Sequence, residues 1–217
     1  MVQALIFDMD GTLFQTGTVL EPALEDTFEH LRRTGLWTGA TPIEGYRSIM
    51  GAPLPRVWEI LMPEHSDAVR KLTDEDFLGR LVARISAGRA ALYPHVEELF
   101  AHLKAQGYTL LIASNGLRAY LEAIVGYYGL DRWVTEVFSI EDLHSLDKSQ
   151  LVRAALDKHG IDAAVMVGDR LSDIRAAKEN GLTAIGCRFD FAKEEELQQA
   201  DFIVDDLLEI KEILPSL

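Results

Sequence analysis

The sequence has little cysteine and a shortage of basic residues, and each shortage excludes a class of protein. Only one cysteine, Cys187, occurs in 217 residues, so an internal disulfide is impossible and a reducing compartment is expected. Lysine and arginine together number 21 against 35 aspartates and glutamates, which gives a formal net charge of −14. Because this charge repels polyanions, we expect no nucleic-acid partner.

Long apolar runs and a secretion signal are also missing. No run approaches the roughly 18 apolar residues that span a bilayer, and no basic stretch precedes the apolar amino-terminal segment. We therefore expect a cytoplasmic protein without a membrane partner. The histidines show no metal-ligand spacing, so we expect no zinc site. Hydrophobic residues make up 48% of the chain, enough to bury a core in one domain or in one domain with a sizeable insertion.

The most informative segment is the apolar run from Val2 to Phe7, which ends in Asp8-Met9-Asp10-Gly11. Two acids one residue apart point to opposite faces of a continuing strand, so both can serve one site only if the chain leaves strand geometry after Asp8. Gly11 permits such a turn. Because neighbouring carboxylates repel each other, a bound cation is expected, and oxygen ligands favour Mg²⁺ over Zn²⁺.

Three further polar motifs stand where apolar, strand-like runs end or where a helical pattern begins. The run 108–113 ends in Ser114-Asn115-Gly116, and the run 163–167 ends in Gly168-Asp169, with Asp173 four residues later. Lys148 opens a helical pattern between these two motifs. Since α/β sheets bind ligands at the carboxyl ends of their strands, we expect all four motifs on one rim of a sheet.

In their order and their strand-end positions, these motifs resemble those of the haloacid dehalogenase-like hydrolases, and the resemblance covers the whole chain. It points to the branch similar to phosphoglycolate phosphatase, with a helical C1-type cap. The resemblance implies an α/β fold in which a Rossmann-like parallel sheet core carries an inserted all-helical cap. It also implies an enzyme, a Mg²⁺-dependent phosphoric monoester hydrolase that acts on a small phosphorylated metabolite through an aspartyl-phosphate.

The resemblance gives Asp8 and Asp10 the catalytic roles. Asp8 would attack phosphorus as the nucleophile. Asp10 would protonate the leaving alcohol and then take a proton from the attacking water, while its backbone carbonyl binds the metal. These groups suit phosphoryl transfer, because its catalysis consists mostly of positioning and charge neutralisation.

The resemblance assigns the remaining motifs to phosphate and metal. Ser114 and Asn115 would bind phosphate oxygens ahead of a helix, and Lys148 would add a positive charge to the same oxygens. Asp169 would join Asp8 and Asp10 as a metal ligand, and Asp173 would bind the metal or orient its ligands. Both acids could instead only cap a helix amino terminus, a common place for aspartate. The family's usual Gly-Lys-Pro is Asp147-Lys148-Ser149 in this chain.

The periodicity of the chain predicts two regions. From residue 94 to the end, strand patterns at 108–113, 134–138, 163–167, 183–187 and 202–204 alternate with helical patterns, as in a parallel sheet. Between residues 15 and 88 the apolar spacing is helical only. We therefore expect a core domain of residues 1–14 and 89–217 and a helical cap of residues 15–88, with linkers near 14–20 and 88–93. Without the resemblance, these helices could simply cover the sheet.

Four alternative functions differ in what they require. A dehalogenase of this family needs neither a metal nor a second acid, so Asp10 argues against it. A phosphonate hydrolase needs a Schiff-base lysine in the cap, and residues 15–70 contain no lysine. A phosphohexose mutase similar to β-phosphoglucomutase uses the same two acids and stays open. A non-catalytic binding or regulatory module should have lost Asp8, Asp10, Lys148 or Asp169, and all four are present.

Specificity is expected to lie in the cap. Arg47 is a cation just before the loop from Gly51 to Pro55, and both are plausible contacts for the leaving group. Thr16 belongs to Phe14-Gln15-Thr16, where many family members carry an acid and a serine, so we expect substrate entry to differ there. Either a monomer or a homodimer is compatible with the sequence.

Overall fold

The computed structural model describes residues 2–49, 52, 54–143 and 145–217, and its centre is a parallel sheet of six strands in the order β3-β2-β1-β4-β5-β6. The strands are β1 (Ala4–Phe7), β2 (Thr109–Ser114), β3 (Glu136–Ser139), β4 (Ala164–Gly168), β5 (Thr183–Cys187) and β6 (Phe202–Val204). These bounds lie close to the predicted strand patterns, and the predicted α/β class with a Rossmann-like core is confirmed.

The register of the sheet brings the motif-bearing strand ends together. In β1, Phe7 is paired with Ile112 of β2 on one side and with Val167 of β4 on the other. These three positions therefore lie at one level near the carboxyl ends of their strands. Asp8, Ser114 and Asp169 all stand within two residues of this level, which is why sequence segments more than 100 residues apart meet at a single rim.

Helices cover both faces of the sheet because alternate strand residues point to opposite sides. Leu5 and Phe7 face a core with α5 and α6, whereas Ala4 and Ile6 face a core with α7 and α8. The helices after residue 90 are α5 (Val96–Ala105), α6 (Arg118–Tyr128), α7 (Lys148–His159), α8 (Leu171–Glu179), α9 (Glu194–Leu197) and α10 (Ile210–Ile213), with short 3₁₀ turns at Leu130–Arg132, Ile140–Asp142, Leu207–Glu209 and Leu214–Ser216.

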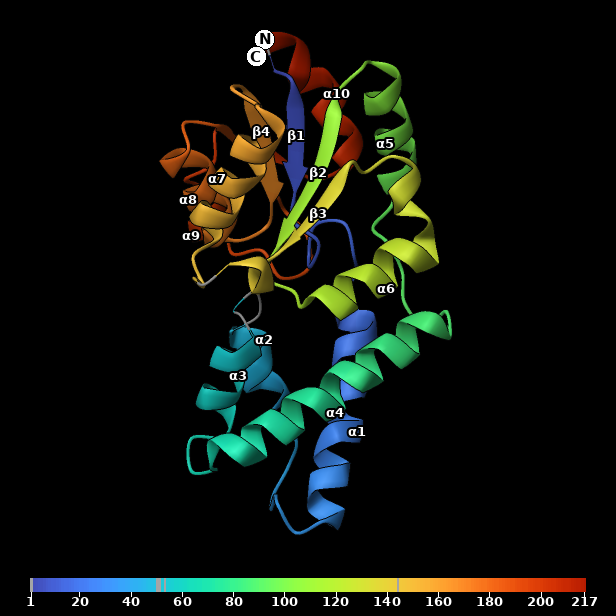
Figure 1. Ribbon diagram of the computed structural model, residues 1–217, viewed down its shortest axis with the longest axis vertical. Coiled ribbons are helices and arrows are strands. Elements are labelled where there is room, and N and C mark those ends of the chain that lie inside the picture. Colours follow the sequence, from blue (N-terminus) through green and yellow to red (C-terminus); the bar gives the residue numbers. More distant parts are fainter. Residues whose placement is uncertain (1, 50–51, 53, 144) are drawn as a thin grey trace.

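The predicted helical region between β1 and α5 consists of α1 (Gly17–Arg33), α2 (Ile43–Ser48), α3 (Leu54–Leu61) and α4 (Asp67–Ser86). Figure 1 shows these helices beyond the carboxyl ends of the strands, where α1 and α4 pack together and α4 packs against α6. In the described part of the chain, no helix is long and apolar enough to cross a membrane.

One linker differs from the prediction. We expected a connecting segment near residues 14–20, but α1 begins at Gly17. The reason is that Val19 and Leu20 are buried on the same face as Leu24 and Phe28, so the apolar stripe continues one turn further toward the amino terminus.

Two neighbouring segments, residues 13–15 and 91–93, connect the helical region to the sheet. The Gln15 amide donates to the carbonyl of Ala91 at 2.9 Å, and the Tyr93 amide donates to the carbonyl of Leu13 at 2.9 Å. Because the outgoing and returning segments bond to each other, the helical region enters and leaves beside the loop that follows β1.

A stability prediction follows from the packing under β1. The rings of Phe7 and Phe100 lie 5.0 Å apart between their centroids, and Phe100 is fully buried. We expect Phe100→Ala to lower the free energy of unfolding by about 3–5 kcal/mol, because it leaves a cavity beneath the central strand. Urea denaturation monitored by circular dichroism would measure this loss. Leu72→Ala, at a position 59% exposed, is the control and should change stability by less than about 0.5 kcal/mol; equal losses would contradict this account.

Candidate active site

The chain leaves strand geometry at the end of β1, as the spacing of the two acids predicted. The Met9 carbonyl accepts hydrogen bonds from the amides of Leu13 at 3.0 Å and Phe14 at 2.9 Å, which closes a tight turn. Gly11 lies in this turn with φ of 75°, and a Cβ there would stand 2.4 Å from an Asp169 carboxylate oxygen. Glycine is therefore required both for the backbone angle and for the close approach of Asp169.

A buried ion cluster forms beside this turn. The Lys148 ammonium lies 2.8 Å from Asp8 Oδ1 and 2.5 Å from Asp173 Oδ1, and its side chain is only 3% exposed. Burial acts to lower the pKa of Lys148, but attraction to Asp173 and Asp8 outweighs it and raises the pKa above its usual value. Lys148 is therefore a permanent cation that ties the first strand end to α8.

Asp169 is the second acid of the cluster, and its environment penalises its charge. Its Oδ1 accepts a hydrogen bond from the Thr12 hydroxyl at 3.0 Å. Burial, together with the nearby charges of Asp173 and Asp8, raises the pKa of Asp169 well above its usual value. Burial is also the main reason why the pKa of Asp8 rises to about 7, against the opposing effect of Lys148.

These three acids have the geometry of a cation site. One carboxylate oxygen each from Asp8, Asp169 and Asp173 lies within 4.8 Å of the others, and all three residues are buried. Hard oxygen donors suit Mg²⁺, and a bound divalent cation would compensate the charge that a single lysine leaves unbalanced. The donor set of this site therefore fits the expected metal.

Asp173 takes its place through the start of α8. The helix begins at Leu171, between Asp169 and Asp173, as predicted. Asp173 Oδ2 accepts a hydrogen bond from the Arg170 amide at 2.9 Å, and its Oδ1 contacts Lys148. Since both oxygens already have partners in the protein, this geometry suits a residue that holds Lys148 and the helix start more than a direct metal ligand.

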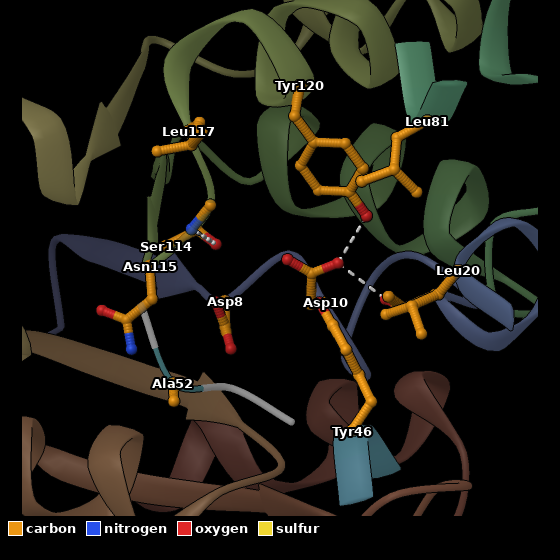
Figure 2. Close-up of a pocket in the computed structure, with 12 residues that line it drawn as sticks. Asp8, Asp10, Leu20, Tyr46, Ala52, Leu81, Ser114, Asn115, Leu117 and Tyr120 are labelled. Carbon is orange, nitrogen blue, oxygen red and sulfur yellow. Dashed lines mark hydrogen bonds between the residues drawn. The ribbon is translucent and has the colours of Figure 1, made fainter. Parts of the chain in front are cut away.

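Asp10 has a different environment from Asp8. Its Oδ1 accepts hydrogen bonds from the Tyr120 hydroxyl at 2.6 Å and the Thr16 hydroxyl at 2.7 Å, and Figure 2 shows the Tyr120 ring reaching down to it from α6. Burial raises the pKa of Asp10, and the two hydroxyls partly offset that rise. Both hydroxyls donate to Oδ1, which leaves Oδ2 of Asp10 available for proton transfer.

Asp8 and Asp10 share one pocket with the predicted phosphate-binding segment. Ser114 and Asn115 line this pocket at the end of β2. The Ser114 hydroxyl accepts a hydrogen bond from the Gly116 amide at 3.1 Å, and Ser139 at the end of β3 donates to the Gly116 carbonyl at 2.7 Å. Two neighbouring strands therefore hold the segment. Lys148 contacts Asp8 and lines an adjoining hollow, which also includes Asn115.

The expected specificity residues separate into two groups. Thr16 lines the pocket through its bond to Asp10. The structure does not bring Arg47 there: its guanidinium pairs with Glu21 at 2.5 Å and Glu44 at 2.6 Å, beside a different hollow. Of the predicted loop from residue 51 to residue 55, Ala52 lines the pocket, whereas residues 51 and 53 lie outside the described residues.

Two residues of the site were missed by the sequence reasoning. Thr12, which bonds Asp169, lies directly after Gly11, and its place in the first turn was the only available signal. Tyr120, which bonds Asp10, lies 110 residues away from it along the chain. Its position four residues after Gly116, on the helix that leaves the phosphate-binding segment, could have marked it as a candidate.

Relatives of known name match nearly the whole chain. A 5'-nucleotidase of Pseudomonas aeruginosa is 25% identical over 98% of this chain and 95% of its own length. A phosphoglycolate phosphatase of Neisseria gonorrhoeae is 29% identical over 98% of this chain and 93% of its own length. The crystal structure of a predicted phosphoglycolate phosphatase from Haemophilus somnus superposes with a TM-score of 0.83 at 22% identity, covering 98% of both chains.

The family itself is shown by a family model. The model of the haloacid dehalogenase-like hydrolases matches residues 2–181, which span the first strand end, the helical region, the phosphate-binding segment, Lys148 and the acid pair at the start of α8. The sequence-based resemblance is therefore confirmed: this chain is a hydrolase of the haloacid dehalogenase-like family.

Proposed function

We propose that the chain is a Mg²⁺-dependent phosphatase that hydrolyses a small phosphorylated metabolite through an aspartyl-phosphate. The observation that carries this proposal is that two carboxylates in one pocket, buried Asp8 and partly buried Asp10, have different kinds of partner. Asp8 contacts a lysine cation at a candidate metal cluster, whereas Asp10 is held by two neutral hydroxyls. Groups placed in such different environments can divide nucleophilic and acid–base work between them.

The nucleophile in this proposal is Asp8. Its Oδ1 accepts hydrogen bonds from the Met9 amide at 2.8 Å and lies against Lys148, so Oδ2 is the oxygen placed to react. Oδ2 forms a bond to phosphorus while the bond from phosphorus to the leaving oxygen breaks. The Ser114 hydroxyl and Lys148, which has a third N–H beyond its two carboxylate contacts, would bind the phosphoryl oxygens.

The general acid and base is Asp10. Its carboxyl first gives a proton to the leaving alcohol, which departs neutral. The resulting carboxylate then takes a proton from the water that attacks phosphorus and releases Asp8. Tyr120 keeps its hydroxyl proton, because burial and the neighbouring Asp10 raise its pKa well above the usual value, and so it stays a donor that orients Asp10.

The metal would be held by Asp8, Asp169 and the Asp10 carbonyl, with Asp173 fixing Lys148 beside them. When bound, Mg²⁺ supplies the positive charge that lets an anionic phosphate approach an anionic nucleophile. The helical region over the rim would act as a cap of residues 15–88 on a core of residues 1–14 and 89–217. It would shield the site from bulk water and form part of the substrate wall.

A test of the nucleophile uses Asp8→Asn. The amide preserves the shape of the side chain but cannot form the aspartyl-phosphate, so turnover of p-nitrophenyl phosphate should fall by at least about a thousandfold. Circular dichroism and the melting temperature would check that the variant folds. Hydrolysis within about tenfold of wild type would exclude the covalent mechanism. In wild type, detecting inorganic phosphate as product separates a phosphatase from a mutase and from a non-catalytic module.

A second test concerns the metal and does not depend on turnover alone. Adding Mg²⁺ to chelator-treated protein should raise the melting temperature, since a ligand that binds only the folded state stabilises it. Asp169→Asn should abolish that rise as well as activity, whereas Asp142→Asn, at an acid that pairs with Arg118 outside the cluster, should keep both. Ca²⁺ should support little activity because its coordination is larger and looser. Full activity after exhaustive chelation would disprove the metal assignment.

A third test addresses Tyr120. Tyr120→Phe removes one of the two hydroxyls that orient Asp10, so we expect kcat to fall about tenfold for alkyl phosphates, whose leaving oxygen needs a proton. The loss should be much smaller for p-nitrophenyl phosphate, whose leaving group departs as an anion. Tyr127→Phe, at an exposed position of the same helix, is the matched control and should change neither value. Equal losses on both esters would assign Tyr120 a purely structural role.

A further inference from the structure

One wall of the pocket is apolar, in contrast to the acidic floor. Figure 2 shows Leu20, Tyr46, Leu81 and Leu117 around the two acids, from α1, α2, α4 and the residue preceding α6. Leu20, Tyr46 and Leu81 are nearly or fully buried, and Leu117 is half-buried. Because the phosphoryl group must lie at Asp8, this wall faces the side of the pocket where the leaving group of a substrate would be placed.

The described lining of the pocket supplies no cation to a leaving group. Among its described lining residues, none is lysine, arginine or histidine, and the two charged ones are Asp8 and Asp10. The undescribed residues nearby in the sequence, 50, 51 and 53, are Met, Gly and Pro. Arg118, which follows Leu117 directly, pairs with Asp142 and is 40% exposed, so its charge is neutralised at the surface.

The Tyr46 hydroxyl adds a neutral polar group to the apolar wall. Tyr46 lines the pocket and is 6% exposed. Burial and the nearby Asp10 raise the pKa of this hydroxyl, so it stays protonated. Figure 2 shows the side chain extending from α2 toward Asp10. A protonated hydroxyl that lines a pocket can donate to a hydroxyl or ether oxygen of a ligand.

We infer that the substrate is a phosphate monoester whose leaving group is uncharged and has an apolar body. This inference rests on the proposed phosphatase function and names the substrate class of the same site. A carboxylate or second phosphate on the leaving group would be buried beside Asp10 without a counter-ion, at a high desolvation cost. An apolar body instead gains from contact with the leucines, and one hydroxyl on it can bond Tyr46. The class excludes phosphoglycolate, the substrate in the names of several relatives.

The test compares esters with and without a carboxylate on the leaving group. Benzyl phosphate and 4-carboxybenzyl phosphate are both esters of primary alcohols, so their leaving oxygens have similar basicity. We expect kcat/KM to be at least tenfold higher for benzyl phosphate. The smaller pair, 2-hydroxyethyl phosphate and phosphoglycolate, should show the same order. Equal values, or faster hydrolysis of the carboxylated esters, would overturn the inference and leave the phosphatase function intact. Hydrolysis of none of the four would overturn the proposed function, and the inference with it.

One variant adds the cation whose absence is proposed to exclude charged leaving groups. Leu117→Lys places a cation at the half-buried edge of the wall, and it should reduce the preference for benzyl over 4-carboxybenzyl phosphate at least fivefold. Leu72→Lys adds the same charge at an exposed position of α4 and should keep the wild-type preference. An unchanged preference in a folded Leu117→Lys would show that the missing cation is not what excludes anions. Should that variant fail to fold, the ester ratios of the wild type still decide the inference.

Discussion

The contact of the Lys148 ammonium with Asp8 and Asp173 holds the rest of the site in place. It joins the end of β1 to α7 and, through Asp173, to the start of α8. Burying these charges is costly, and the cost is offset only because each carboxylate has further donors. Asp8 accepts from the Met9 amide and Asp173 from the Arg170 amide. Removing the ammonium would take away the one cation that, among the described residues, contacts both Asp8 and Asp173.

The two catalytic candidates illustrate how one pocket can keep two identical side chains chemically distinct. Asp8 contacts a fixed positive charge, which opposes the rise of its pKa that burial causes. Asp10 is held by neutral hydroxyls on one oxygen and is otherwise surrounded by buried groups, which keeps protonation accessible. Only one residue, Met9, separates them in the sequence, so the difference comes from what tertiary packing brings to each one.

The sequence predicted the core and the rim well because both depend on local patterns. Apolar runs that end in polar motifs indicate parallel strands, and a parallel sheet places Asp8, Ser114 and Asp169 at one edge without further information. The helical region was equally visible in its apolar spacing. The Tyr120 contact to Asp10 could not be predicted, because it depends on the rotation of α6 relative to the first loop. Arg47 was singled out for its charge, but local pairing with Glu21 and Glu44 turns it away from the pocket.

The two connecting segments beside Asp10, residues 13–15 and 91–93, affect how such an enzyme can diverge in evolution. Since residues 13–15 and 91–93 bond to each other, an exchange of everything between them would keep the sheet, the ion cluster and the first loop. Such an exchange would replace Leu20, Tyr46 and Leu81, yet Leu117 and Tyr120 belong to the core and would remain. A lineage that exchanges the helical region would therefore change one part of the pocket wall and replace Thr16, while it keeps Tyr120, the other hydroxyl partner of Asp10.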